Sequence, residues 1–386
     1  MSEKALRRML KGPAPPSYPP GICVARLRLS QAGFALFGRR KSAILGKEAR
    51  LERWRDTEAV RIGKHDVAIS NPDKLFFPER GLTKGDLVQY YVDVAGCALN
   101  HIANRPFHMK RYPNGVDGDF FHQKRVPAHP DYVGEQFVQF PSGHSTVFAV
   151  VDNPAALAWV VNLGCIELHT WHSRVSEIEK PDYMLIDLDP SEGNPWEYVL
   201  EIAPVVREVL DELGLPSYPK TSGATGFHIL TPIKPELVFP EVRRFAKAVA
   251  EEVERRVGDQ RVATTTWRVA DREGVFVDFG QNARDRTIAS AYSIRPTPDA
   301  RASAPLNWDE VPATDPAAFT LETMRDRIAA VGDPTAGMWR RRTSLRPRFE
   351  QLGLTPPQDS QQSEPAGRSP RRRGRPPGSR ESRRRS

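Results

Sequence analysis

The hydrophobic pattern predicts an ordered body that begins near Val60. Polar and apolar residues alternate over residues 60–70, as in a strand or a short hairpin. Apolar residues then recur at helical spacing over residues 84–98, and Thr83 stands where a side chain commonly caps a helix N-terminus. One face of this helix would carry the apolar positions Leu87, Tyr90, Tyr91, Val94 and Leu99.

Strand-like and helix-like segments alternate along the rest of the body. Residues 154–164, 195–214, 240–257 and 320–331 have the character of helices, and Gly214 is a typical helix stop. Residues 106–150 predict strands and turns, and short apolar runs typical of strands end near Asp187 and Asp278. This alternation predicts an α/β fold.

Charge divides the 386 residues into an acidic body with two basic arms. Residues 1–55 carry a net charge of +10 and residues 355–386 carry +6, which leaves −8 for residues 56–354 from the total of +8. Basic arms favour a polyanionic partner, because neutralising phosphates releases counterions. We therefore expect a disordered arm at 1–55, a folded domain over 60–350 and a disordered tail at 356–386.

Cysteine spacing and the lengths of the apolar runs indicate the cellular compartment. Cys23, Cys97 and Cys165 stand far apart without the spacing of a zinc site, which favours reduced thiols. No apolar run is long enough to span a membrane, and no secretory signal precedes the body. We expect a cytoplasmic protein with no membrane partner.

Asp187 and Asp189 end an apolar strand and are candidate metal ligands. Because side chains alternate along a strand, both carboxylates should project from one face while Leu188 points away. A hard divalent cation between them would relieve their repulsion. Two Asp at a strand end can also simply cap the next helix.

Asp278 is the one charged residue of a second apolar strand. A carboxylate in such a strand needs a partner. Three carboxylates can hold two divalent ions that activate a 3′-hydroxyl and neutralise a triphosphate. The alternative is an ion pair with one of the many arginines.

A glycine-rich turn over residues 221–228 is a candidate anion site. Glycines such as Gly223 let a turn present backbone N–H groups, and Ser222 adds a hydroxyl. The turn lacks the Lys-Ser/Thr ending of a P-loop. His169, which ends another apolar strand, and Arg295, which can bind phosphate with two hydrogen bonds, are further candidates.

Six motifs in fixed order resemble the polymerase domain of bacterial ligase D, a member of the archaeo-eukaryotic primase superfamily that serves non-homologous end joining. The motifs are SNPDKLFFPERGLTKGDLVQYY, KRYPNGVDGDFFHQK, IELHTW, PDYMLIDLDP, KTSGATGFH and VDFGQN followed by AYSIR. The resemblance covers about residues 60–350. It implies an RRM-like catalytic sheet packed against a second α/β portion built largely from residues 60–180.

The resemblance also implies roles for individual residues. Asp187, Asp189 and Asp278 are similar to a catalytic triad that binds two Mn²⁺ or Mg²⁺ ions. Lys74 and Lys84 resemble the pair that grips a 5′-phosphate across a gap, and Phe121 resembles an aromatic that stacks on the template. Contacts with the incoming NTP or dNTP would come from Ser222, Gly223, His228, His169, Gln281, Arg295 and Arg111.

The chain differs from this family pattern in two respects. Thr225 stands where relatives often have a lysine that can touch the triphosphate, which predicts weaker nucleotide binding or a substitute cation. No adenylation motif of a ligase is present, so we expect a stand-alone polymerase. The resemblance then implies DNA with gaps or breaks, the end-binding protein Ku and a separate ATP-dependent DNA ligase as partners, and a location at the bacterial nucleoid.

The tail contains a segment similar to an AT-hook. Its core is Arg373, Gly374, Arg375 and Pro376, flanked by further arginines. Arginines in an extended backbone are attracted into a narrow minor groove. Such a tail would tether the chain to DNA.

Four functions remain open from the sequence. The leading hypothesis is a DNA-directed nucleotidyltransferase that extends 3′ ends and fills short gaps. A primase that makes primers de novo would use the same pocket. A DNA-binding paralogue without activity would keep the fold, although all three carboxylates are present. A glycosyltransferase also uses paired Asp with manganese, but the third Asp and the two lysines argue against it.

Overall fold

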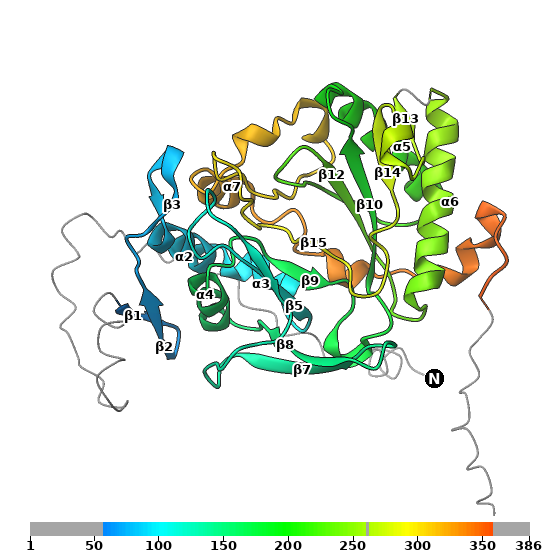
Figure 1. Ribbon diagram of the computed structural model, residues 1–386. Helices are drawn as coiled ribbons and strands as arrows, with labels where there is room; N and C mark the ends of the chain where they lie inside the picture. The colour runs from blue at the N-terminus through cyan, green and yellow to red at the C-terminus, as the bar shows by residue number, and fades with distance from the viewer. Residues whose placement is uncertain (1–56, 260–261, 358–386) are drawn as a thin grey trace, which may run out of the picture.

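The structure, a computed structural model, describes residues 57–259 and 262–357 and consists of two sheets with their helices. Figure 1 shows one sheet around β10 and β14, and the other around β5, β8 and β9. The predicted arm at 1–55 and the Arg-rich segment of the tail lie outside the described residues.

The first sheet carries the candidate carboxylates and has five strands. Its strands, in spatial order, are β11 (Tyr218–Thr221), β12 (Phe227–Pro232), β10 (Tyr183–Pro190), β14 (Val275–Asp278) and β13 (Ala263–Thr264). All neighbours pair antiparallel except β13 and β14. The strands that carry Asp187 and Asp278 are neighbours.

Two long helices, α5 (Trp196–Glu212) and α6 (Phe239–Val257), cover one face of this sheet. Figure 1 shows α6 along the outer side of the sheet. Ile186 and Leu188 are fully buried against these helices, because every second residue of β10 points toward them. Asp187 and Asp189 lie on the opposite face, which confirms the predicted alternation.

The second sheet has six strands. Its main path is β15 (Thr287–Ala289), β9 (His169–Trp171), β5 (Pro106–Arg111), β8 (Ser145–Val150) and β7 (Gly134–Gln139), with β6 (Phe121–Gln123) paired to β5. The associated helices are α2 (Lys84–Asp93), α3 (Ala95–Ile102) and α4 (Pro154–Asn162). As predicted, residues 60–180 supply most of this part, and residues from 291 to 324 complete its core.

Helix α2 begins where the sequence predicts. The Thr83 side chain accepts a hydrogen bond from the Asp86 N–H, and the Asp86 carboxylate accepts one from the Thr83 N–H, which forms a capping box. The predicted helix to residue 98 is divided, since α2 ends at Asp93 and α3 follows after Val94. The predicted apolar positions of both helices are buried.

The remaining elements are short. They are β1 (Thr57–Ile62), β2 (His65–Ser70), β3 (Leu75–Phe77), β4 (Leu82–Thr83), α7 (Met324–Val331) and several 3-10 turns. None of the helices in the described part of the chain is long and apolar enough to cross a membrane.

The chain crosses from the first sheet to the second directly after Asp278. Strand β14 ends at this residue, and β15 begins nine residues later and pairs with β9. A buried ion pair joins the sheets a second time, because Arg105 just before β5 contacts Asp182 just before β10 at 2.6 Å. These connections hold the carboxylates of the first sheet against the side chains of the second.

Candidate active site

The three predicted carboxylates meet on neighbouring strands. Asp187 of β10 lies directly opposite Asp278 of β14, while Asp189 extends into solvent at the end of β10. Burial, followed by the charges of Asp278 and Asp189, raises the pKa of Asp187 to about 8. Burial also raises the pKa of Asp189, although the nearby Arg272 opposes that effect. The cluster therefore contains more negative charge than its neighbours neutralise.

The donor set of this cluster fits hard divalent cations. It offers only carboxylate oxygens, which Mg²⁺ and Mn²⁺ accept readily. As the side chains stand, the described residues contain no group of three or more His, Cys, Asp or Glu that could hold a metal ion. Both oxygens of Asp278 accept hydrogen bonds, from Gly280 N at 2.5 Å and from Gln281 Nε2 at 3.0 Å. Each oxygen keeps a second lone pair, so Asp278 can bind a cation while these hydrogen bonds orient its carboxylate.

His228 joins the carboxylates to a buried lysine that sequence reasoning missed. Its Nε2 lies 3.4 Å from Oδ1 of Asp187, and its Nδ1 lies 2.7 Å from Nζ of Lys220. Lys220 is buried beside Ala289 O and Ser303 Oγ, at 2.9 and 2.5 Å. The only sign of it in the sequence was its place two residues before Ser222, because the pairing of Lys220 in β11 with His228 appears only in the structure.

The glycine-rich turn is built differently from the prediction. Ser222 Oγ accepts hydrogen bonds from the N–H groups of Ala224 and Gly226, so these two amides are not free to bind an anion. Gly223 has a φ of +76°, and a Cβ there would lie 2.6 Å from Cγ of Arg295. The glycine is therefore needed for close packing against Arg295. Thr225 is exposed at the tip of the turn.

Buried Glu167 contacts three basic side chains of the site. No pattern in the sequence marked it as a functional residue. Its carboxylate contacts Lys110 Nζ at 2.7 Å, Arg295 Nε at 3.0 Å and His169 Nε2 at 3.4 Å. The Tyr112 hydroxyl donates a further hydrogen bond at 2.9 Å. Burial would raise the pKa of Glu167, but the hydrogen bond from His169 and the nearby cations hold that pKa well below its usual range.

The predicted 5′-phosphate pair lies together, next to Arg111. Lys84 Nζ contacts Ser70 O at 2.6 Å, and Lys74 Nζ contacts Pro113 O at 2.8 Å. Burial, followed by the charges of Lys74 and Arg111, lowers the pKa of Lys84 to about 8. The sequence gives no sign of this depression, which arises from long-range packing.

Arg111 and the candidate stacking residue Phe121 form a pair. The Arg111 guanidinium lies 5.2 Å from the ring centre of Phe121 and donates hydrogen bonds to Leu163 O and Gln123 Oε1. Phe121 is 45% exposed, so part of its ring is accessible to solvent. Arg111 thus contacts Phe121, and its charge acts on Lys84. Its contact with the incoming nucleotide stays a prediction.

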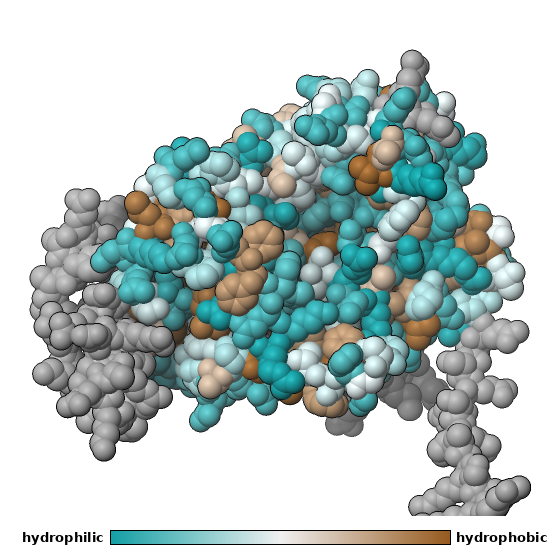
Figure 2. All heavy atoms as spheres, viewed as in Figure 1, coloured by the Kyte–Doolittle hydropathy of each residue, from teal (hydrophilic) through white to brown (hydrophobic). Residues whose placement is uncertain are grey.

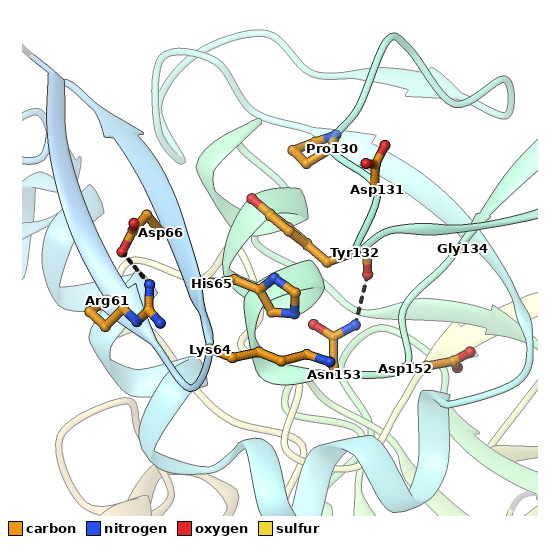
Figure 3. A pocket seen from close by; sticks show the side chains of 10 residues that line it. All are labelled: Arg61, Lys64, His65, Asp66, Pro130, Asp131, Tyr132, Gly134, Asp152 and Asn153. Carbon is orange, nitrogen blue, oxygen red and sulfur yellow. Dashed lines mark hydrogen bonds and ion pairs between the residues drawn. The ribbon is translucent and has the colours of Figure 1, made fainter. Parts of the chain in front are cut away.

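A separate cavity of about 910 Å³ contains none of the predicted site residues. Figure 3 shows it between the β1–β2 hairpin and the loop before β7. His65 packs against Tyr132 with ring centres 4.8 Å apart, and Asn153 Nδ2 donates to Tyr132 O. Its lining mixes both charge signs, so it shows no preference for a particular ligand.

Comparison with known proteins identifies the family. The model of the LigD primase-polymerase domain matches residues 83–335, which include every candidate site residue of the body except Lys74. The chain belongs to this family. Members of the family are nucleotidyltransferases that use divalent metal ions, so the chain is an enzyme of this class.

Relatives of known name support the assignment. The multifunctional non-homologous end joining DNA repair protein LigD of Mycobacterium tuberculosis is 34% identical over 279 residues, which are 69% of this chain and 36% of that protein. The bifunctional LigD protein of Bacillus subtilis is 29% identical over 331 residues, which are 83% of this chain and 52% of that protein. The chain therefore spans about a third to a half of the relatives that it matches.

A solved structure has the same fold. The polymerase domain of Mycobacterium tuberculosis ligase D, in complex with DNA, superposes with a TM-score of 0.66 and 31% identity. The match covers 71% of this chain and 98% of that domain. The described body thus contains a nearly complete polymerase domain of this family.

Proposed function

We propose that this chain extends 3′ ends and fills short gaps at DNA breaks, as a template-directed nucleotidyltransferase of non-homologous end joining or related repair. The observation that carries the proposal is the register of β10 and β14, which sets Asp187 opposite Asp278. His228 contacts Asp187 from the neighbouring strand β12. Arg295 lies nearby and donates a hydrogen bond to the carbonyl of Ser222. The relatives, one named for end joining and DNA repair and one solved in complex with DNA, agree with this function.

The carboxylates would hold two Mn²⁺ or Mg²⁺ ions. Such ions, when bound, would activate the attacking 3′-hydroxyl and neutralise the charge that develops on the triphosphate. A cation would relieve the repulsion among the three carboxylates. Without one, burial, followed by the charges of Asp278 and Asp189, raises the pKa of Asp187 to about 8. Asp189, at the exposed end of β10, would complete the ligand set from the solvent side.

The residues around the glycine-rich turn would hold the NTP or dNTP. Arg295 is anchored by Glu167 and by the carbonyl of Ser222, so its guanidinium is fixed without being fully buried. The hydroxyl hydrogen of Ser222 stays free to donate, because its oxygen accepts both turn amides. Fixed donors bind a developing phosphate charge without reorganisation. His169 and Gln281, beside Glu167 and Asp278, would complete this group.

Lys74, Lys84 and Phe121 would position the DNA. The two lysines would contact the 5′-phosphate on the far side of a gap, while the exposed ring of Phe121 would stack on the template. Arg111, beside Phe121, would contribute positive charge to the binding of the incoming nucleotide. We further propose Ku and a separate ATP-dependent ligase as partners, and a location with the DNA in the bacterial cytoplasm.

A gapped-DNA extension assay tests this function. It uses a labelled primer, a 5′-phosphorylated downstream strand, manganese, and each NTP and dNTP in turn. Templated addition by the wild-type chain, absent from Asp187→Ala/Asp189→Ala, is the expected result. Synthesis on an unprimed template would favour a primase instead. Intact DNA binding without any addition would favour the inactive paralogue, with Thr225 as the first residue to examine.

A further inference from the structure

An exposed tryptophan stands beside the carboxylates, outside the residues considered so far. Trp267 is 58% exposed and lies in the 265–274 loop, which connects β13 with β14. A Cβ added at Gly280 would lie 2.8 Å from Cζ3 of Trp267 and 2.9 Å from Oδ1 of Asp278. The indole and the carboxylate are therefore separated by little more than the space of one methyl group. Figure 2 shows a small hydrophobic patch among hydrophilic side chains over β13 and β14.

Aromatic and cationic side chains hold the indole in place. The ring of Phe276 lies 6.2 Å from the Trp267 ring at a steep angle, and Phe279 lies at 6.5 Å. Arg272 donates hydrogen bonds to Trp267 O and Thr266 O, which fix the loop backbone. The loop thus holds the Trp267 ring exposed to solvent, although its aromatic neighbours Phe276 and Phe279 are buried.

The strand order places Trp267 on a defined side of the reaction centre. Across the sheet, His228 of β12 and Lys220 of β11 lie on one side of Asp187, while Asp278 of β14 and the loop after β13 lie on the other. In nucleotidyl transfer the attacking and leaving oxygens lie in line, on opposite sides of the phosphorus. With the triphosphate held near His228, as the proposed function requires, the 3′-hydroxyl must approach from the side of Trp267.

We propose that Trp267 is the stacking platform for the 3′-terminal base of the strand being extended. The inference rests on the proposed function, because that function sets the direction of attack. The surface has the two properties of single-strand binding sites, an open aromatic face and adjacent positive charge. Arg243, whose guanidinium lies 5.8 Å from the Trp267 ring centre, and exposed Arg268 supply that charge. Phe121, on the second sheet, serves the template strand separately.

Fluorescence of 2-aminopurine tests the proposal without requiring turnover. Gapped DNA carries 2-aminopurine as the 3′-terminal primer base and is titrated with the full chain in the absence of nucleotide. Stacking on the indole is expected to quench the probe, more strongly than when it is placed at an internal primer position. Equal quenching at both positions in the wild-type chain would overturn the proposal.

Three variants locate the effect. Trp267→Leu keeps an apolar side chain without an aromatic face, Trp267→Phe keeps the face, and Val269→Ala alters an exposed residue of the same loop. Trp267→Leu should abolish the quenching and raise the KM for gapped DNA about ten-fold, with the KM for nucleotide unchanged. Trp267→Phe and Val269→Ala should resemble the wild type. Thermal denaturation of each variant checks whether the fold is retained.

The outcomes separate this inference from the proposed function. Wild-type quenching that survives in folded Trp267→Leu would overturn the stacking role even if the enzyme extends primers. Quenching lost only from a probe in the template strand would do the same, because it would assign Trp267 to the other strand. Absence of nucleotide addition by the wild-type chain would instead overturn the proposed function, while the quenching would still report the contact.

Discussion

Lys220 Nζ lies 2.7 Å from Nδ1 of His228, at the point where the two strands that carry them pair directly. The other two neighbours of Lys220 are acceptors, since Ala289 offers a carbonyl and Ser303 donates its own hydrogen to Thr221 O. Burial, followed by the charge of Arg295, lowers the pKa of Lys220 well below its ordinary value. Lys220 is thus a positioning residue that aims Nε2 of His228 at Asp187.

Replacement of Lys220 tests this relationship. Lys220→Met should lower kcat about ten- to a hundred-fold, as the loss of outer hydrogen-bond partners does at other metal-dependent sites. If Lys220 acts through His228, the double variant Lys220→Met/His228→Ala should be no slower than His228→Ala alone. Additive losses of kcat would assign Lys220 an independent role. Retained binding of gapped DNA provides the control for folding.

Asp187→Asn should abolish nucleotide addition and yet stabilise the metal-free protein. The folded-state pKa of about 8 lies above the ordinary value of 3.8, so between these values the folded chain holds a proton that the unfolded chain has released. This group therefore lowers the free energy of unfolding as pH rises toward 8. In EDTA, the wild-type Tm should fall more steeply than that of Asp187→Asn between pH 5 and 8.

Manganese should reverse this difference. A cation that binds the folded carboxylates stabilises only the folded state. The wild-type Tm at pH 8 should therefore rise with added Mn²⁺, whereas the Tm of Asp187→Asn should rise less. An equal rise in both proteins would show that the metal binds elsewhere. Differential scanning calorimetry provides both measurements.

The preference for a 5′-phosphorylated gap should depend on pH through Lys84. Its pKa of about 8 means that the ammonium is present below that pH and is lost above it. The ratio of affinities for phosphorylated and unphosphorylated gaps should therefore fall between pH 7 and 9. Lys84→Arg should keep the ratio constant over this range, because a guanidinium stays charged. In Lys74→Ala/Lys84→Ala, the ratio of these two affinities should be close to one. A double variant that still prefers the phosphorylated gap would refute the phosphate contact.

Glu167→Gln should weaken nucleotide binding more than DNA binding. The variant keeps the shape of the side chain but removes the charge that anchors Arg295 and Lys110. We expect the KM for nucleotide to rise about ten-fold. The free energy of unfolding should fall by about 2 kcal/mol. This loss is smaller than for a fully buried ion pair, because both cations reach solvent. Glu251→Gln, at an exposed position of α6, is the matched control. Equal effects on both KM values would count against this role.

Deletion of residues 358–386 should weaken DNA binding and reduce its dependence on salt. The tail that contains Arg373 and Arg375 lies outside the described residues, so this prediction rests on charge alone. Fewer phosphate contacts release fewer counterions, which lowers the slope of log K against log salt. Binding measured by anisotropy between low and moderate salt gives the slope, and an unchanged value would make the tail irrelevant to DNA binding.

Local sequence determined the elements and part of the site. Alternation along residues 183–189 placed Asp187 and Asp189 on one face, because side-chain direction on a strand has a period of two. Thr83 marked the start of α2, because capping depends only on residues close in sequence. Three carboxylates with a glycine-rich turn then indicated the chemistry.

Only the tertiary structure decided which groups face one another. Pairing of β10 with β14 set Asp187 against Asp278, and pairing of β11 with β12 set Lys220 against His228. The contacts of Glu167 with Lys110 and Arg295, and the depressed pKa of Lys84, depend on residues distant in the chain. Charge interactions and burial act through space, so local patterns predicted the donors but not their partners.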